Sequence, residues 1–313
     1  MSIRGRSLIH IDDLELSQFQ QLNSRAQYFK REFLENKTID HLILGRNVRQ
    51  EVMVQVYFEP STRTRVSFEM AAKRLGVRSI LVGADGSTSV SKGETFQDTL
   101  ENVAAMLPDL MVVRYSGEPE ITEVMRTLPF PVISGGSGIN SHPTQALVDA
   151  FTIKEHFGMV EGRKVLIVGD VVHSRVASSN LSLLSRLGAE IAITGPESMI
   201  PSEGDWADVK KFETLRAGLE WCDVCMCLRI QKERHAANFG VSHDDYKTSF
   251  LLDRSGLEIL GNRGIVMHPG PVVRDVDIAS DVLSDPRSKV RTQVTNGVFI
   301  RAALLSAILG IEV

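Results

Sequence analysis

The chain has 313 residues, and its 35 Lys and Arg residues against 39 Asp and Glu residues give a formal net charge of −4. Hydrophobic residues at 43% and charged residues at 24% are ordinary globular values, which exclude disordered and fibrous classes. A balanced charge without a basic run argues against a nucleic-acid-binding protein, and no apolar run reaches the ~18 residues of a membrane helix. Because Asp12 and Asp13 precede any long apolar run, we expect no secretory signal and a soluble cytoplasmic protein of about two domains.

Short apolar runs alternate with helical patterns along the chain, which predicts an α/β fold in which mainly parallel sheets are flanked by helices. The first set of predicted strands covers 52–58, 79–83, 110–113 and 131–134, with helices over 61–75 and 94–107. The second set has strands over 164–170, 190–194, 223–228 and 264–268, with helices over 174–187 and 296–309.

A helix that starts at Pro143 lies between the two sets, and we expect it to connect two domains. The predicted first domain covers residues 1–142 and is completed by a returning C-terminal helix within 293–313. The predicted second domain covers residues 143–292.

The three cysteines, Cys222, Cys225 and Cys227, crowd into one predicted strand. A structural zinc site needs a fourth ligand and usually a second pair of cysteines, and no such pair follows. We therefore interpret these thiols as reduced core residues of a buried parallel strand and expect no metal site.

The strongest chemical signal is the segment Phe58-Glu-Pro-Ser-Thr-Arg-Thr-Arg65, between a buried strand and a helix. A helix N-terminus carries unpaired N–H groups and about half a positive charge, so it attracts anions. Capping of the helix explains one hydroxyl, but not three hydroxyls beside Arg63 at the carboxyl end of a parallel strand, where α/β proteins bind ligands. The segment predicts a phosphate site.

Other polar residues follow predicted strands or begin predicted helices. Arg114 follows one strand and Arg229 another, and Arg175 stands at a helix start where it suits a carboxylate better than a dinucleotide, since G-x-G-x-x-G is incomplete. His142 and Gln145 lie one helical turn apart and point to the same side. Solvated arginines and a core histidine are the alternatives.

The motifs together resemble the aspartate/ornithine carbamoyltransferase family, and the aspartate branch most. Ser61-Thr-Arg-Thr-Arg65 is similar to the carbamoyl-phosphate motif, and Ser89 to Glu94 to a loop whose lysine, here Lys92, reaches a neighbouring active site. His142-Pro-Thr-Gln145 and His268-Pro-Gly-Pro271 also resemble motifs of the family. The segments Gly169 to Arg175 and Leu228 to Arg234 resemble its substrate-binding segments. A second lysine of some relatives is replaced by Ser91.

The resemblance implies attack of the α-amine of L-aspartate on carbamoyl phosphate, an early step of pyrimidine synthesis. It implies that phosphate is bound by Ser61, Thr62, Arg63 and Thr64. It implies that the carbonyl is polarised by Thr64, Arg114 and His142. The carbamoyl nitrogen would be oriented by Gln145 and by the backbone near Gly270 and Pro271. The aspartate carboxylates would be bound by Lys92, Arg175, Arg229 and Gln231.

No metal or organic cofactor is implied, and the expected assembly is a homotrimer that shares its active sites. Regulatory or dihydroorotase-like chains stay open as further partners. Ornithine carbamoyltransferase is the first alternative, but Arg229 and the lack of the His-Cys-Leu-Pro segment typical of that branch favour aspartate. The second alternative is an inactive structural paralogue, in which site residues would be lost, and none of those named is lost.

Overall fold

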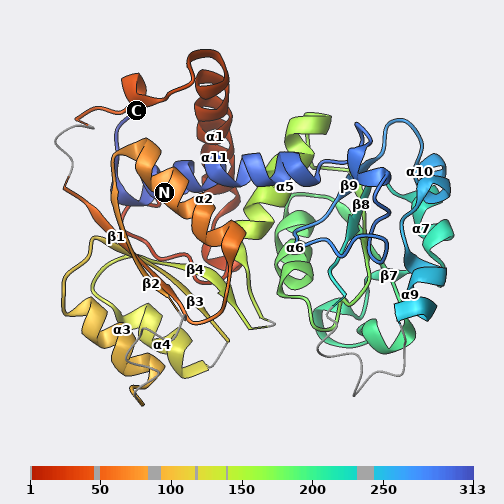
Figure 1. Cartoon of the computed structure of the whole chain (residues 1–313), viewed down its shortest axis with the longest axis horizontal. Coiled ribbons are helices and arrows are strands. Elements are labelled where there is room, and N and C mark those ends of the chain that lie inside the picture. Colours follow the sequence, from red (N-terminus) through yellow and green to blue (C-terminus); the bar gives the residue numbers. More distant parts are fainter. Residues whose placement is uncertain (1, 46–49, 84–92, 117–118, 139, 231–242) are drawn as a thin grey trace. The chain divides into compact units, whose positions relative to one another are not determined.

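The computed structural model describes residues 2–45, 50–83, 93–116, 119–138, 140–230 and 243–313 (Figure 1). It divides into unit 1, residues Met1–Phe151 with Val294–Val313, and unit 2, residues Thr152–Gln293. The first divide falls inside helix α5 (Pro143–Phe157), where we expected it at the start of that helix. The second falls near the start of helix α11 (Val290–Leu309).

Unit 1 is built on a sheet of four parallel strands in the order β2-β1-β3-β4. These strands are β1 (Val52–Tyr57), β2 (Arg78–Gly83), β3 (Leu110–Tyr115) and β4 (Val132–Ser137). The other helices are α1 (Leu16–Asn36), α2 (Thr62–Leu75), α3 (Phe96–Ala104) and α4 (Pro119–Thr127), with short 3-10 turns at Ile11–Asp13 and Asp40–Leu42. Figure 1 shows α3 and α4 on one face of the sheet and α1, α2 and α11 on the other.

Helix α2 forms where the sequence predicts it. Phe68, Ala71, Ala72 and Leu75 recur with helical spacing and are fully buried, so one face of the helix packs in the core. Gly76 ends the helix with φ of 78°, a left-handed conformation that costs glycine little.

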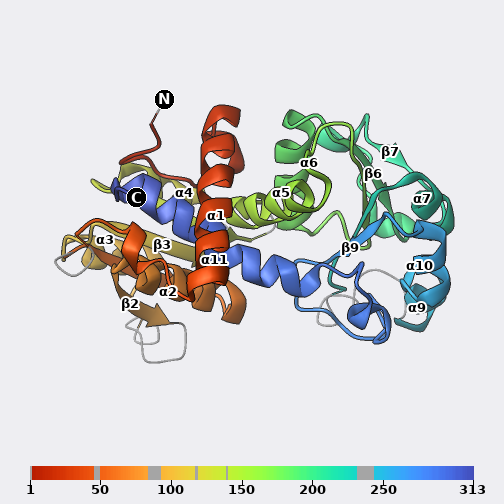
Figure 2. The ribbon, with the colours of Figure 1, turned by 90° about the horizontal axis from the view of Figure 1, so that it is seen from above.

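Helices α1 and α11 lie across each other within unit 1, as Figure 2 shows. Arg25 Nη1 of α1 donates to Ser306 Oγ at 3.0 Å, and Lys30 Nζ donates to Asn296 Oδ1 at 2.7 Å. By length and composition alone, helix α11 could span a membrane. From the sequence we expected no apolar segment of that length. About two thirds of its most apolar stretch is buried inside the protein, which is typical of a core helix.

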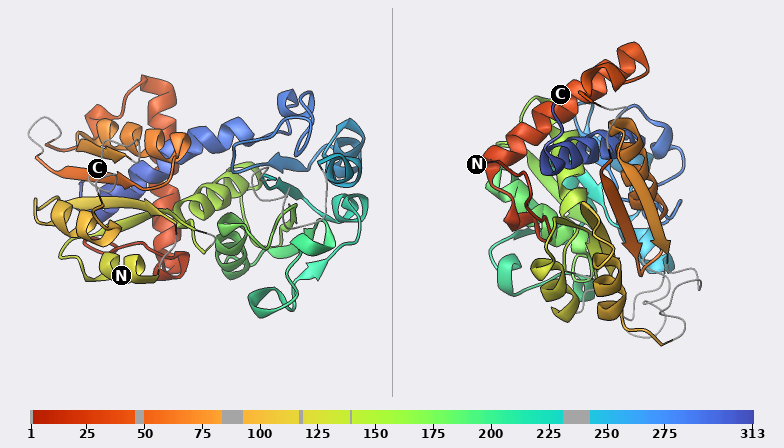
Figure 3. Two further views of the ribbon diagram at one scale, coloured as in Figure 1. Left: turned by 60° about the horizontal axis from the view of Figure 1, so that its bottom comes forward. Right: turned by 90° about the vertical axis from the view of Figure 1, so that its left-hand side faces the viewer.

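Unit 2 is built on a sheet of five parallel strands in the order β7-β6-β5-β8-β9 (Figure 3). The strands are β5 (Lys164–Val168), β6 (Glu190–Thr194), β7 (Lys210–Lys211), β8 (Val224–Cys227) and β9 (Ile265–Met267). The helices are α6 (Arg175–Arg186), α7 (Leu215–Trp221), α9 (His243–Phe250) and α10 (Arg254–Leu260), with 3-10 turns at Glu197–Met199, Gly204–Trp206 and Val282–Ser284. The predicted α/β class with two parallel sheets is confirmed.

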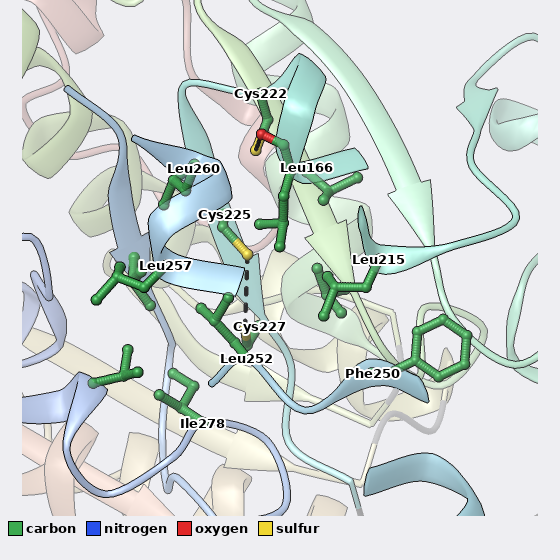
Figure 4. Close-up of a cluster of buried hydrophobic side chains, with 14 of the residues drawn as sticks. Leu166, Leu215, Cys222, Cys225, Cys227, Phe250, Leu252, Leu257, Leu260 and Ile278 are labelled. Carbon is green, nitrogen blue, oxygen red and sulfur yellow. Dashed lines mark hydrogen bonds between the residues drawn. The ribbon is translucent and has the colours of Figure 1, made fainter. Parts of the chain in front are cut away.

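The cysteines lie in the core of unit 2, in a cluster with leucines of α7 and α10 (Figure 4). All three are buried, and the Sγ atoms of Cys225 and Cys227 are 3.9 Å apart. Burial raises the pKa of the Cys222 thiol. The pKa of the Cys225 thiol is raised by the hydrogen bond between Cys225 and Cys227 and by burial. Protonated thiols in an apolar layer act as small hydrophobic residues, so the interpretation as core residues is confirmed.

Candidate functional site

The sheet of unit 1 has one topological switch point, between β1 and β3. After β1 the chain forms β2 on one side of it and then β3 on the other side, so the connections leave the carboxyl ends of β1 and β3 in opposite directions. Open α/β sheets bind ligands at the crevice this creates. The segment Ser61 to Thr64 follows β1, and Arg114 lies near the end of β3, so the predicted residues flank this point.

The first turn of α2 supplies the hydroxyls and the arginine of the predicted phosphate site. Ser61 is the N-cap residue in extended conformation, but its side chain makes no capping hydrogen bond. In contrast, Thr95 and Ser174 do cap their helices by accepting from the N–H three residues on. Arg63 is exposed and Thr64 is buried. A serine that does not cap its helix leaves N–H groups of the first turn available to an anion.

Arg114 is held against the end of β1. The strand extends to Tyr115, beyond the predicted end at Val113, so Arg114 lies inside β3 and pairs in register with Tyr57 of β1. Its Nη1 donates to the carbonyl of Gly135 at 3.1 Å, and its Nε is 3.4 Å from Oε2 of Glu59. A side chain that is 12% exposed and held by two partners presents its charge in a fixed direction.

His142 and Gln145 begin helix α5 behind the end of β4. The N–H of Ser137, the last residue of β4, donates to the carbonyl of Ser141 at 2.8 Å, which closes a tight turn before His142. The carbonyl of His142 accepts from the N–H of Gln145 at 3.0 Å, and the side chain of His142 is buried. The amide of Gln145 donates to Oδ1 of Asp149 at 2.8 Å.

A buried arginine of the C-terminal helix supports both helix starts. Arg301 Nη1 donates to Ser67 Oγ at 2.8 Å, and Ser67 Oγ donates to the carbonyl of Thr64 at 2.9 Å. Its Nη2 donates to Thr144 Oγ1 at 3.1 Å, in the first turn of α5. Burial lowers the pKa of Arg301 to about 10, while Tyr57 and Asp149 oppose this shift. Arg301 thus remains a cation at neutral pH beneath the predicted phosphate site.

Unit 2 has its own switch point, between β5 and β8. The chain forms β6 and β7 on one side of β5, and then β8 and β9 on the other. Gly169 ends β5 with φ of 115°, and a Cβ atom there would lie 2.9 Å from the hydroxyl of Tyr246. Arg175 is the first residue of α6, and Arg229 follows β8 by two residues; both are half-buried. Two arginines at this edge of the sheet have the charge and the donor geometry that suit a carboxylate.

Asp277 and His268, both fully buried, join two loops of unit 2. The N–H of Gly270 donates to His268 Nδ1 at 2.8 Å, so Nε2 carries the ring hydrogen and donates to Asp277 Oδ2 at 3.1 Å. Asp277 also accepts from the N–H of Val273 at 2.8 Å and of Ile230 at 3.3 Å. The network links Ile230, the residue next to Arg229, to the turn at Gly270.

The structure thus places the segment Ser61 to Thr64 and Arg114 at the switch point of unit 1, and Arg175 and Arg229 at that of unit 2. His142 and Gln145 follow β4 instead, and Gly270 and Pro271 follow β9. Lys92 and Gln231 lie outside the described residues. Sequence reasoning missed Asp149, Arg301 and Asp277, which act from behind the site. Among the described residues no group of three His, Cys, Asp or Glu side chains is placed to hold a metal ion.

Family models match both parts of the chain. Residues 6–155 match the model described as "Aspartate/ornithine carbamoyltransferase, carbamoyl-P binding domain". Residues 161–308 match the model described as "Aspartate/ornithine carbamoyltransferase, Asp/Orn binding domain".

Curated relatives cover almost the whole chain. The chain is 39% identical to an aspartate carbamoyltransferase catalytic subunit of Helicobacter pylori, with 99% of each chain covered. It is 42% identical to the same subunit of Solibacter usitatus, over 97% of this chain and 99% of that one.

Solved structures of both branches share the fold. An aspartate transcarbamoylase of Trypanosoma cruzi in complex with carbamoyl phosphate and aspartate is 26% identical, with a TM-score of 0.86 and 98% of each chain covered. An ornithine carbamoyltransferase of Pyrococcus furiosus is also 26% identical, with a TM-score of 0.86 and 99% of each chain covered.

Proposed function

Because the chain belongs to the aspartate/ornithine carbamoyltransferase family, we propose that it is an aspartate carbamoyltransferase. The α-amine of L-aspartate attacks the carbonyl carbon of carbamoyl phosphate. A C–N bond forms, the bond from that carbon to the phosphate oxygen breaks, and the proton of the amine passes to the departing phosphate. The products are N-carbamoyl-L-aspartate and phosphate, at an early step of pyrimidine synthesis.

Unit 1, which corresponds to the first domain predicted from the sequence, binds carbamoyl phosphate. The first turn of α2 holds the phosphate through Ser61, Thr62, Arg63 and Thr64. Thr64, Arg114 and His142 polarise the carbonyl, and Gln145 accepts from the carbamoyl nitrogen. Each fixed donor or cation beside a developing oxyanion lowers the activation free energy by about 3–4 kcal/mol.

Unit 2 binds aspartate, with Arg175 and Arg229 on its carboxylates and Gln231 in support. The carbonyls near Gly270 and Pro271, held by His268, accept from the carbamoyl nitrogen. No side chain acts as a nucleophile. Positioning of the two substrates supplies most of the rate enhancement, an effect worth up to about 7–11 kcal/mol.

The enzyme acts as a cytoplasmic homotrimer in which Lys92 of one subunit binds phosphate and aspartate in its neighbour's site. Two features support a subunit interface on unit 1. The first is a set of large apolar side chains that are exposed: Ile80 and Leu81 of the edge strand β2, and Val66 and Met70 of α2. The second is that the segment with Lys92 directly follows β2 in the sequence. Regulatory or dihydroorotase-like chains remain candidates for further partners.

The observation that carries this function is the placement of hydroxyls and arginines at the switch points of both sheets. Arginines at the second switch point favour a dicarboxylate over ornithine, whose ammonium group they would repel. The test is an assay of carbamoyl transfer from carbamoyl phosphate to L-aspartate and to L-ornithine side by side. Transfer to ornithine alone, or to neither acceptor, would overturn the proposal.

A further inference from the structure

Asp149 fixes the orientation of the amide of Gln145. It lies one turn further along α5, is fully buried, and its Oδ1 accepts from Gln145 Nε2 at 2.8 Å. A carboxylate can only accept hydrogen bonds, whereas the two ends of an amide are of nearly the same shape. The amino group of Gln145 must therefore face Asp149, and its oxygen Oε1 is the end left for a ligand.

Arg301 interacts with Asp149 and holds the same turn of helix. The carboxylate of Asp149 raises the pKa of Arg301 against the effect of burial, so the two charges interact inside the protein. Arg301 also donates to Thr144, the neighbour of Gln145, at 3.1 Å. The amide of Gln145 and the helical turn that carries it are thus both held by buried residues.

An acceptor in this place distinguishes two acyl phosphates of equal shape. A carbamoyl group ends in NH2 and an acetyl group in CH3, so only the carbamoyl group can donate to Oε1 of Gln145. We propose that Asp149 is a positioning residue that makes the site specific for the amino group of carbamoyl phosphate, by holding the oxygen of Gln145 toward it. The inference rests on the proposed function.

The test compares carbamoyl phosphate with acetyl phosphate as donors to L-aspartate, through the ratio of their kcat/KM values. In Asp149→Asn the single amide oxygen is drawn to the cation of Arg301, so the amino group of the new residue faces Gln145 and turns its amide over. The amino group of Gln145 then opposes that of the substrate. We expect the ratio to fall at least tenfold, chiefly through slower use of carbamoyl phosphate.

A double-mutant cycle separates this role from a structural one. Gln145→Ala removes the amide, so adding Asp149→Asn to it should leave the ratio where Gln145→Ala alone puts it. If the Asn variant does not fold, Asp149→Ser removes the carboxylate, and Arg301 keeps its hydrogen bonds to Ser67 and Thr144. This variant frees the amide and should lower the ratio as well.

An unchanged ratio in a folded Asp149 variant, or a further fall in the Gln145→Ala background, overturns the inference. Either result would leave the proposed function standing, because the wild-type enzyme would still carbamoylate aspartate. Failure of the wild type to carbamoylate aspartate would instead overturn the proposed function.

Discussion

Replacement of Asp277 by Asn changes one oxygen of a buried carboxylate into an amino group and leaves its size unchanged. Oδ2 accepts two hydrogen bonds, from Val273 N at 2.8 Å and from His268 Nε2 at 3.1 Å, whereas Oδ1 accepts one, from Ile230 N at 3.3 Å. We therefore expect the amide oxygen to take the place of Oδ2. The amino group then faces the N–H of Ile230.

Two buried donors that face each other cost about 1–3 kcal/mol, and the two remaining hydrogen bonds each lose about 1 kcal/mol with the charge of their acceptor. The variant should be about 3–5 kcal/mol less stable, and its melting temperature should fall by about 10 °C. Because Ile230 directly follows Arg229, we expect the KM for aspartate to rise about tenfold as the backbone beside Arg229 loses this hydrogen bond.

Asp275→Asn is the matched control. It makes the same chemical change two residues earlier, in an exposed carboxylate that accepts from Ser280 N and Oγ at 2.9 and 3.0 Å. Its effect on stability should be small, because hydrogen bonds of an exposed carboxylate contribute little. Thermal unfolding and steady-state kinetics measure both variants. If Asp277→Asn melts and binds aspartate like Asp275→Asn, the network does not hold the backbone beside Arg229.

Arg63→Ala should lower turnover at least a hundredfold with an unchanged melting temperature, since an exposed cation contributes little to stability; near wild-type activity would refute the phosphate site. Arg63→Ala and Lys92→Ala proteins, each inactive alone, should recover about a quarter of the sites after dissociation and random reassembly; a mixture that stays inactive although hybrids form would place Lys92 in its own subunit's site. Asp285 accepts from Arg287 Nε at 2.9 Å and Nη2 at 3.1 Å, and these bonds hold the pKa of its carboxyl well below the usual value. Asp285→Asn should thus lower stability above about pH 4, and this deficit should shrink as pH falls below the unfolded pKa of about 3.9; a deficit that persists at low pH in urea titrations would contradict the role of the charge.

The parts of the fold that follow a clear period were predictable from the sequence. Helix α2 has apolar residues at helical spacing, a serine before it and a glycine after it, so its bounds and its role agree with the prediction. Helix α1 was not predicted. In this helix the polar residues Gln18 and Asn23 are buried, and the apolar residues Leu16 and Leu34 are exposed. Such exceptions weaken the helical periodicity of apolar residues in the sequence.

The candidate substrate-binding residues could be proposed because they lie in short segments after strands, where residue type indicates the local chemistry. Strand order could not be predicted in the same way. The alternation of strands and helices indicates parallel sheets, but it leaves open on which side of β1 the chain forms β3. That order places Arg114 beside the end of β1, and only the structure supplied it.

The buried charges behind the site were beyond the sequence for a different reason. Arg301 reaches Ser67 across 234 residues, and Asp277 reaches Ile230 across 47. Neither residue has a neighbour in the sequence that marks it as more than an exposed charge. Each nevertheless lies where an isolated charge would be strongly unfavourable, and each makes hydrogen bonds to segments that carry candidate substrate-binding residues. The segments of the candidate site therefore depend for their geometry on buried charges, and those charges in turn depend on the same segments for their hydrogen bonds. For this reason we expect substitutions at Arg301 or Asp277 to alter stability and substrate binding together, whereas substitutions at exposed Arg63 alter binding alone.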